Sequence, residues 1–163
     1  MIRPCTDTDV PGIFAVVNDA AQAYKGVIPA DCWHEPYMPL DELKKEIAAG
    51  VRFCGYEDGG QLVGVMGMQP VRDVTLIRHA YVKSNRRHRG IGGELLAYWL
   101  RQLDGKILVG TWKAAGWAIK FYEKHGFQLV SEAEKDRLLQ TYWDIPRRQI
   151  ETSVVLVYKG FPS

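Results

Sequence analysis

Residues 81–93, with the sequence YVKSNRRHRGIGG, combine the residue types that bind an anion. An expected strand ends at Val82, four positive charges follow between Lys83 and Arg89, and three glycines precede an expected helix. The N-terminus of a helix presents free backbone N–H groups and the positive end of its dipole. Glycines let a ligand approach the backbone, and arginines add charge. The residues alone therefore predict a strand–loop–helix that binds a phosphate-like anion.

Two common nucleotide-binding motifs do not match this loop. A P-loop requires a lysine after its last glycine, where Glu94 stands, and a GxGxxG motif requires a third glycine, where Leu95 stands. Contact with nucleic acid is disfavoured, because the basic run is short and the isoelectric point, near 8.4, is unremarkable. A solvated basic loop that turns on its glycines stays open as the plain alternative.

Two segments fit motifs of one family. Residues 87–92 (RHRGIG) fit the signature R/Q-x-x-G-x-G/A, and residues 118–127 (AIKFYEKHGF) fit the pattern AxxFYxxxGF. Together they resemble the GNAT superfamily of N-acetyltransferases. The first lies on an expected strand–loop–helix and the second on an expected helix–turn–strand, as the family requires. The resemblance covers nearly the whole chain. It implies acetyl-CoA as the acetyl donor and a primary amine as the acceptor, joined by direct attack through a tetrahedral intermediate.

The resemblance also assigns roles to individual residues. The coenzyme pyrophosphate would lie on backbone N–H groups between Arg87 and Gly93, the N–H of Val82 would stabilise the oxyanion, and Tyr122 would protonate the leaving thiolate. A core aromatic role for Tyr122 is the alternative. One departure is Ala115, where family members often carry an asparagine that contacts the pantetheine arm. The complete coenzyme-binding set is predicted to be Tyr81, Val82, Arg87, His88, Arg89, Gly90, Ile91, Gly92 and Gly93.

His79 is the candidate for the general base that deprotonates the acceptor amine. His79 precedes Tyr81 by two residues in an expected strand, so regular alternation would place both on one face. An imidazole with an ordinary pKa near 6.5 suits general-base chemistry at neutral pH. A satisfied core histidine and proton loss to bulk water both stay open. His34 and Glu35 are predicted to bind the substrate, because the proline-rich and aromatic loop 25–39 would cover the acceptor side. They could also hold or deprotonate the ammonium in place of His79.

The order of elements predicts one mixed α/β domain over residues 1–163, with a mostly antiparallel sheet flanked by helices in the order β-α-α-β-β-β-α-β-α-β-(α)-β. Thr6 and Asp9 form a predicted capping box before the first helix, and Leu40, Leu43 and Ile47 are expected to face inward from the second. Strands are expected over residues 2–4, 51–57, 61–69, 74–82, 106–112, 127–130 and 149–158. The last of these is also a possible site of pairing in a homodimer.

Composition sets the remaining bounds. The 163 residues are 47% hydrophobic, with three separated cysteines and no histidine spacing typical of a metal site, so neither a disulfide framework nor a metal is expected. No apolar run approaches the roughly 20 residues of a membrane helix, and we expect a cytoplasmic protein without a membrane partner. The net charge of +2 divides into −4 for residues 1–82 and +6 for residues 83–163. This split is compatible with an anionic donor and a cationic acceptor, or with scattered surface charge.

The predicted activity is therefore transfer of an acetyl group to the amine of a small molecule. An enzyme that acetylates a protein N-terminus or a lysine side chain is a close rival. A non-catalytic acyl-CoA-binding or sensing module belongs to a different class: Tyr122 argues against it, and Ala115 argues weakly for it.

Overall fold

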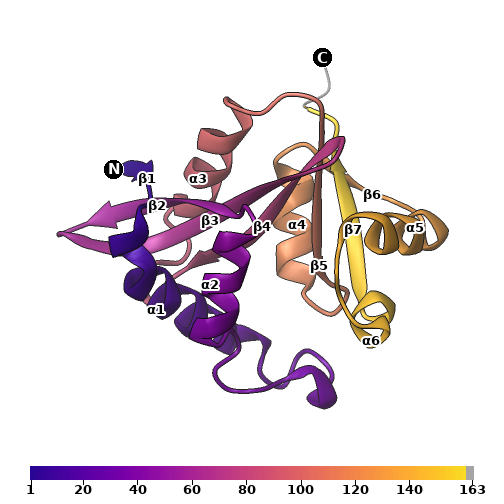
Figure 1. The fold of residues 1–163 in the computed structure, drawn as a ribbon, viewed down its shortest axis with the longest axis horizontal. Helices are drawn as coiled ribbons and strands as arrows, with labels where there is room; N and C mark the ends of the chain where they lie inside the picture. Colours follow the sequence, from indigo (N-terminus) through magenta and orange to yellow (C-terminus); the bar gives the residue numbers. More distant parts are fainter. Residues whose placement is uncertain (161–163) are drawn as a thin grey trace.

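A twisted sheet of seven strands runs through the centre of the computed structural model, which describes residues 1–160 (Figure 1). Its strand order is β1-β2-β3-β4-β5-β7-β6, and every neighbouring pair is antiparallel except β4 and β5. The mixed, mostly antiparallel sheet predicted from the sequence is confirmed. The strands are β1 (Ile2–Pro4), β2 (Arg52–Asp58), β3 (Gln61–Val71), β4 (Val74–Val82), β5 (Lys106–Trp112), β6 (Phe127–Leu129) and β7 (Ser153–Tyr158).

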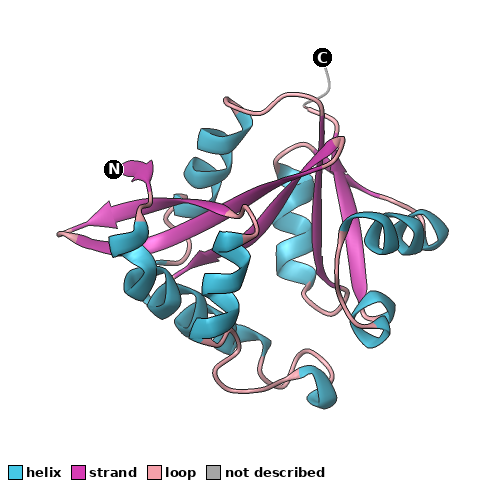
Figure 2. Cartoon of the chain, in the orientation of Figure 1, coloured by secondary structure: helices cyan, strands magenta, loops and turns pink. Residues whose placement is uncertain are grey.

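Helices cover both faces of this sheet (Figure 2). On one face, α1 (Val10–Ala21) and α2 (Leu40–Ala48) pack on a cluster that includes Phe53 and Val65. On the other face, α3 (Ile91–Leu100) and α4 (Gly116–Lys124) pack on the largest core cluster, which includes Met66 and Trp99. Two further helices, α5 (Glu132–Tyr142) and α6 (Arg147–Glu151), precede β7.

The central strands β4 and β5 separate like the arms of a fork. They pair only where Val74–Ile77 faces Lys106–Val109, and beyond that point β5 continues its pairing with β7 alone. Residues 78–82 of β4 and residues 110–112 of β5 therefore do not pair with each other. Side chains or a ligand must fill the opening between the two strands. This fork positions the candidate site.

A bulge interrupts β4 just after the fork opens. Val65 faces Tyr81 and Gly67 faces Arg78, so two residues of β4, His79 and Ala80, stand opposite the single residue Met66. The backbone of His79 has a φ of 55°, which is unusual for a residue with a side chain. The regular alternation that we used to place His79 beside Tyr81 does not hold at this point.

The predicted capping box before the first helix is confirmed. The N–H of Thr6 donates to Asp9 Oδ2 at 2.8 Å, and at the start of α5 the N–H of Glu134 donates to Ser131 Oγ at 3.2 Å. The hairpin between β2 and β3 turns at Gly59 and Gly60, whose positive φ angles suit a tight turn. These features depend on residues close in sequence.

Two element predictions were wrong. Residues 149–152 were expected to begin the last strand, but the N–H groups of Gln149 and Ile150 both donate to the carbonyl of Pro146, which starts the short helix α6. Leu40 was expected to face inward, but it is the first residue of α2 and is 39% exposed. In addition, β7 lies between β5 and β6, and it pairs with β6 over Leu156–Tyr158. The pairing of this strand in a homodimer stays a prediction.

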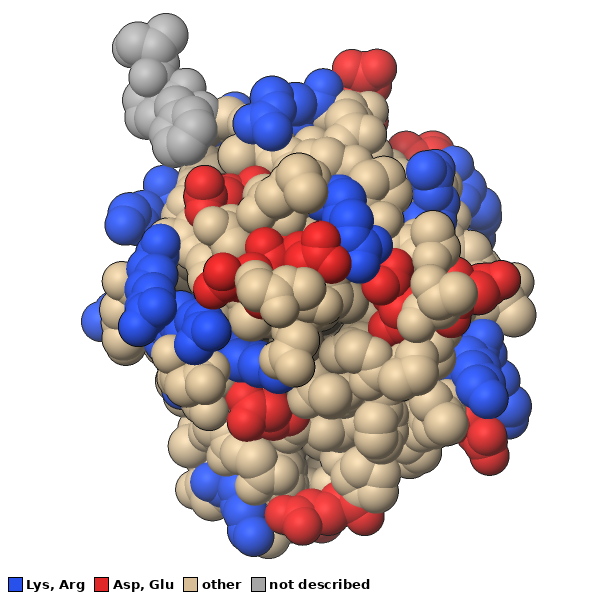
Figure 3. Space-filling model, turned by 90° about the vertical axis from the view of Figure 1, so that its left-hand side faces the viewer, with Lys and Arg blue, Asp and Glu red and all other residues tan. Residues whose placement is uncertain are grey.

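The surface mixes charges of both signs. On the face that carries the β2–β3 hairpin, acidic and basic side chains are interspersed (Figure 3). Several of them pair, as Arg3 does with Asp9 at 2.8 Å and Arg86 with Asp58 at 3.5 Å. Within residues 1–160, no helix has the length and apolar character needed to span a membrane, and no three acidic, histidine or cysteine side chains gather as a metal site would require.

Candidate functional site

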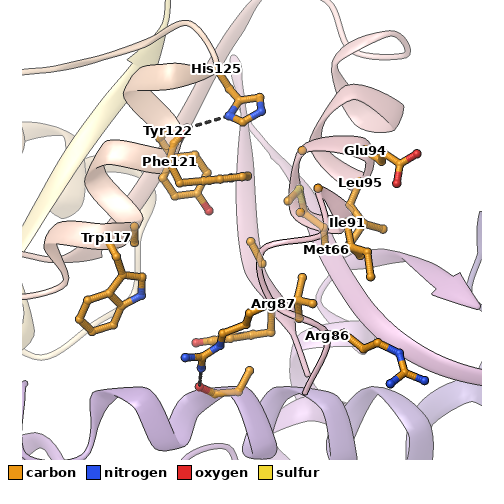
Figure 4. Close-up of a pocket in the computed structure, with 18 of the residues that line it drawn as sticks. Met66, Arg86, Arg87, Ile91, Glu94, Leu95, Trp117, Phe121, Tyr122 and His125 are labelled. Carbon is orange, nitrogen blue, oxygen red and sulfur yellow. Dashed lines mark hydrogen bonds between the residues drawn. The ribbon is translucent and has the colours of Figure 1, made fainter. Parts of the chain in front are cut away.

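A cavity of about 1030 Å³ opens between α1, the fork, the N-terminus of α3 and α4 (Figure 4). It includes most of the predicted coenzyme-binding set: Tyr81, Val82, Arg87, His88, Gly90, Ile91, Gly92 and Gly93. Arg89 is the exception, since it is exposed and outside the lining. Arg89 follows His88, whose backbone has a φ of 64°, and the Arg89 side chain is exposed.

The three glycines at the start of α3 serve different purposes. Gly90 precedes the helix with a φ of 78° and has open space around it, so it supplies the turn. A Cβ at Gly92 would lie 3.3 Å from Phe121, and one at Gly93 would lie 2.9 Å from His125 Nε2. The last two glycines thus allow α3 and α4 to approach each other. The free N–H groups of the first turn of α3 are left at the edge of the cavity.

Val82 is placed where a free backbone donor would be useful. The N–H of Lys83 donates to the carbonyl of Val63 in β3, at 2.8 Å. Successive N–H groups of a strand point to opposite sides, so the N–H of Val82 points away from β3, to the side from which β5 has separated. This donor therefore points into the opening of the fork.

Tyr122 projects from α4 toward the same space. Its ring packs edge-on against Phe121 and Phe127, and the residue is only 6% exposed. Its hydroxyl points into the space between α4 and the loop that carries Arg86 and Arg87 (Figure 4). Burial raises the pKa of Tyr122 above its ordinary value near 10, so the phenol keeps its proton at neutral pH. The ring of Tyr122 therefore packs in the core, while its protonated hydroxyl faces the cavity.

Other lining residues were not predicted as site residues. The sequence patterns assigned no role in the site to Tyr24 or Trp117. In the structure Trp117 is 49% exposed at the cavity and stacks on Tyr24 at 6.0 Å between ring centroids. Phe121 and His125 line the cavity from the next turns of α4, and Arg87 closes it below by donating to the carbonyl of Ala20 at 3.3 Å (Figure 4). Trp117, Phe121 and His125 follow one another at four-residue spacing along α4 and its C-cap, and this helical period was the signal available for them.

A second, smaller cavity of about 110 Å³ lies within the fork. Tyr24 and Tyr81 line both cavities, so the two spaces meet at these side chains. Burial raises the pKa of both tyrosines above the ordinary value. The smaller cavity, which we call the fork cavity, is further lined by Tyr37, Ile77, Arg78, His79, Gly110, Thr111, Trp112, Leu139, Trp143, Ile145, Gln149 and Ser153.

His79 lines the fork cavity and is held by a carboxylate. Its Nε2 lies 2.6 Å from Oε1 of Glu46 in α2, and its ring stacks on Phe53 at 6.1 Å. Arg78 Nη2 lies 3.1 Å from the same carboxylate oxygen. Burial by itself would raise the pKa of Glu46, but the hydrogen bond from His79 and the charges of His79 and Arg78 together hold it below its ordinary value. Glu46 had no place in the sequence analysis, because nothing local links α2 to β4.

The structure does not bring His34 and Glu35 to either cavity. Both are exposed; His34 Nδ1 lies 2.9 Å from the carbonyl of Pro36, and Glu35 pairs with Lys25 at 3.2 Å. The apolar residues of the loop turn inward instead, Ile28 among them, and leave the polar residues in solvent. The loop 25–39 does reach the fork cavity, but through Tyr37.

Comparison with known proteins adds a family and several relatives. The model of the acetyltransferase (GNAT) domain matches residues 49–129, which include the fork, the glycine loop and α4. A curated relative is the peptidyl-lysine N-acetyltransferase YiaC of Escherichia coli (strain K12), which is 24% identical over 143 residues, 88% of this chain and 93% of the relative.

Solved structures share the fold over the whole chain. The PaiA N-acetyltransferase from Thermoplasma acidophilum, in complex with coenzyme A, has a TM-score of 0.72 and 18% identity, covering 98% of each chain. The ribosomal-protein-alanine N-acetyltransferase from Brucella melitensis has a TM-score of 0.66 and 22% identity, covering 99% of each chain. At these identities the likeness shows the fold alone.

Proposed function

Because the chain belongs to the GNAT family of acetyltransferases, we propose that it transfers the acetyl group of acetyl-CoA to the primary amine of a small molecule. The observation that carries the proposal is the meeting of the two cavities at Tyr24 and Tyr81 in the fork. The large cavity has the basic loop and the free N–H groups that an anionic coenzyme needs, and the fork cavity lies on the other side of the same tyrosines. Donor and acceptor would meet there.

We assign the phosphates of the coenzyme to the N-terminus of α3. The N–H groups between Arg87 and Gly93 and the helix dipole favour negative charge at this point. Arg87 and His88 line the cavity and would add contacts to phosphate oxygens. Arg89 is kept as a more peripheral contact, since its side chain lies outside the lining.

The residues of the fork supply the groups that acyl transfer requires. The amine nitrogen attacks the carbonyl carbon of the thioester, and the N–H of Val82 stabilises the negative charge that develops on the carbonyl oxygen. The C–S bond then breaks, and Tyr122 gives its proton to the departing sulfur and recovers one from solvent. The proton lost from nitrogen passes to His79, and from there to solvent.

Glu46 prepares His79 for this role. An ionised carboxylate accepts hydrogen bonds, so the short contact places the imidazole proton on Nε2 and leaves the lone pair on Nδ1. Arg78 keeps Glu46 ionised and in place. In this proposal Glu46 is a positioning residue, and His79 is the group that takes the proton. The acceptor site draws on the lining of the fork cavity and not on His34 and Glu35.

A thiol-release assay with acetyl-CoA and a panel of amines tests the proposal. The panel includes short alkylamines, amino acids, a lysine-containing peptide and a peptide with a free N-terminus. Release that depends on a small amine supports it. Tight coenzyme binding without release for any amine would favour an acyl-CoA-sensing module, and release only with the peptides would favour a protein acetyltransferase.

A further inference from the structure

The fork cavity is closed on one side by the segment 132–151, which contains α5 and α6. Leu139, Trp143, Ile145 and Gln149 of this segment all line the cavity. Trp143 lies directly over β5: a Cβ at Gly110 would be 3.3 Å from its Cζ2 atom. The glycine therefore makes room for the indole, and the indole narrows the space beside β5.

A second wall comes from the loop 25–39. Tyr37 lines the cavity from this loop, and its hydroxyl accepts a hydrogen bond of 2.7 Å from Nε1 of Trp112. This bond holds the loop against the end of β5. The loop and the segment 132–151, which are far apart in sequence, thus form two separate walls of one small cavity. Figure 1 shows α6 near this loop at the lower edge of the molecule.

An ion pair joins the two walls. Arg148 Nε lies 2.9 Å from Asp31 Oδ2, and Arg148 Nη2 lies 3.3 Å from Asp31 Oδ1, a two-point contact between α6 and the loop. The pair is half-exposed, so its contribution to stability is small. Its position is more informative, because Arg148 is adjacent to the lining residue Gln149 and the pair ties the rims of the two walls together.

The lining of the cavity combines aromatic and polar side chains, and none of the residues that line it is acidic; Arg78 and His79, its basic groups, are both held by Glu46. Five aromatic side chains face it: Tyr24, Tyr37, Tyr81, Trp112 and Trp143. Glu46, the nearby carboxylate, is already paired with His79 and Arg78. Aromatic faces attract an ammonium group and also accommodate an alkyl stem. The volume of about 110 Å³ equals that of about four water molecules in the liquid, which suits a short chain.

We propose that Trp143 and the Asp31–Arg148 ion pair set the size limit of the acceptor, which is a short, unbranched alkylamine bound free rather than as part of a polypeptide. This inference rests on the acetyl transfer proposed above and adds the class of the acceptor. A polypeptide backbone would have to lie across the joined rims while its amine reached the fork. A free amine has only to pass between them.

The first test compares acceptors and variants by thiol release. The acceptors are n-butylamine, phenethylamine and a lysine-containing peptide; the variants are Trp143→Ala, Arg148→Ala and the matched control Arg147→Ala, whose side chain is 92% exposed. We expect kcat/KM of the unaltered protein to favour n-butylamine over both larger acceptors. Because opening one side of a pocket changes discrimination by about tenfold or more, this preference should fall by at least that factor in Trp143→Ala and Arg148→Ala. It should be unchanged in Arg147→Ala.

Two outcomes of this assay overturn the inference. One is a peptide that is acetylated as efficiently as n-butylamine by the unaltered protein, and the other is an unchanged preference in both Trp143→Ala and Arg148→Ala. A second measurement separates the inference from the proposed function. Calorimetry of n-butylammonium binding should show weaker binding to Trp143→Ala than to Arg147→Ala, whether or not any acetyl transfer occurs. Equal binding to the two variants overturns the inference, while absence of transfer overturns only the proposed function.

Discussion

Replacing Tyr122 with phenylalanine removes the proposed acid and almost nothing else. The ring keeps its contacts with Phe121 and Phe127, and the volume of the side chain hardly changes. We therefore expect the free energy of unfolding to change by less than about 1 kcal/mol. Coenzyme affinity should also be nearly unchanged, because the proposed phosphate contacts lie on the loop before α3.

The expected effect on turnover follows from the position of the hydroxyl. Tyr122 is nearly buried, so little water is close enough to protonate the departing sulfur in its place. A positioned general acid contributes about 10²-fold to 10⁴-fold to the rate, which corresponds to a barrier higher by about 3–5 kcal/mol in its absence. Because burial raises the pKa of Tyr122 above about 10, the intact acid stays protonated across the neutral range, and no loss of turnover due to this group is expected below pH 10.

Single-turnover thiol release under saturating coenzyme is the suitable assay, since it isolates the chemical step from product release. Tyr158→Phe is a matched control: Tyr158 packs on Phe127 as Tyr122 does, but it does not line either cavity. Turnover of Tyr122→Phe equal to that of Tyr158→Phe, with chemistry limiting the rate, would refute the acid role. A loss of coenzyme affinity in place of turnover would assign Tyr122 to binding.

Three further predictions concern other parts of the chain. Gly90→Asp should weaken coenzyme binding by at least about tenfold in calorimetry, because it adds a negative charge at the phosphate site, whereas Gly105→Asp, also at a positive φ and in open space, should not. Glu46→Gln should lower kcat and leave coenzyme affinity unchanged, because the imidazole of His79 loses the carboxylate that orients it; an unchanged kcat contradicts the positioning role. The hydrogen bonds from Arg3 hold the pKa of Asp9 at about 2, so this carboxylate stabilises the fold above pH 4 and loses that effect as the pH falls toward 2. Asp9→Asn should cost about 1 kcal/mol in urea unfolding at pH 7 and much less at pH 2, and equal losses at both would disprove the charge effect.

The parts of the site that were predictable are those built from consecutive residues. The glycine loop, the start of α3 and the placement of Tyr122 on α4 depend on turn residues, a helix N-terminus and the period of one helix. Each of these signals acts over a few consecutive residues, so the sequence was sufficient to predict the local structure. The predictions for Arg89, His34 and Glu35 concern exposed side chains. There the residue type indicated a charge or a ring but not the direction in which the fold turns it.

Local patterns in the amino-acid sequence were sufficient to predict the order of the elements apart from α6, the glycine loop before α3 and the presence of a tyrosine beside it. Tertiary structure alone decided how far β4 and β5 pair, where the bulge turns His79 toward Glu46, and that β7 lies inside the sheet. It also decided that Trp143 and Tyr37 both line the fork cavity. The physical reason is that a hydrophobic period specifies which face of an element is buried, whereas the partner on that face comes from a distant segment. Its identity depends on the packing of the whole sheet.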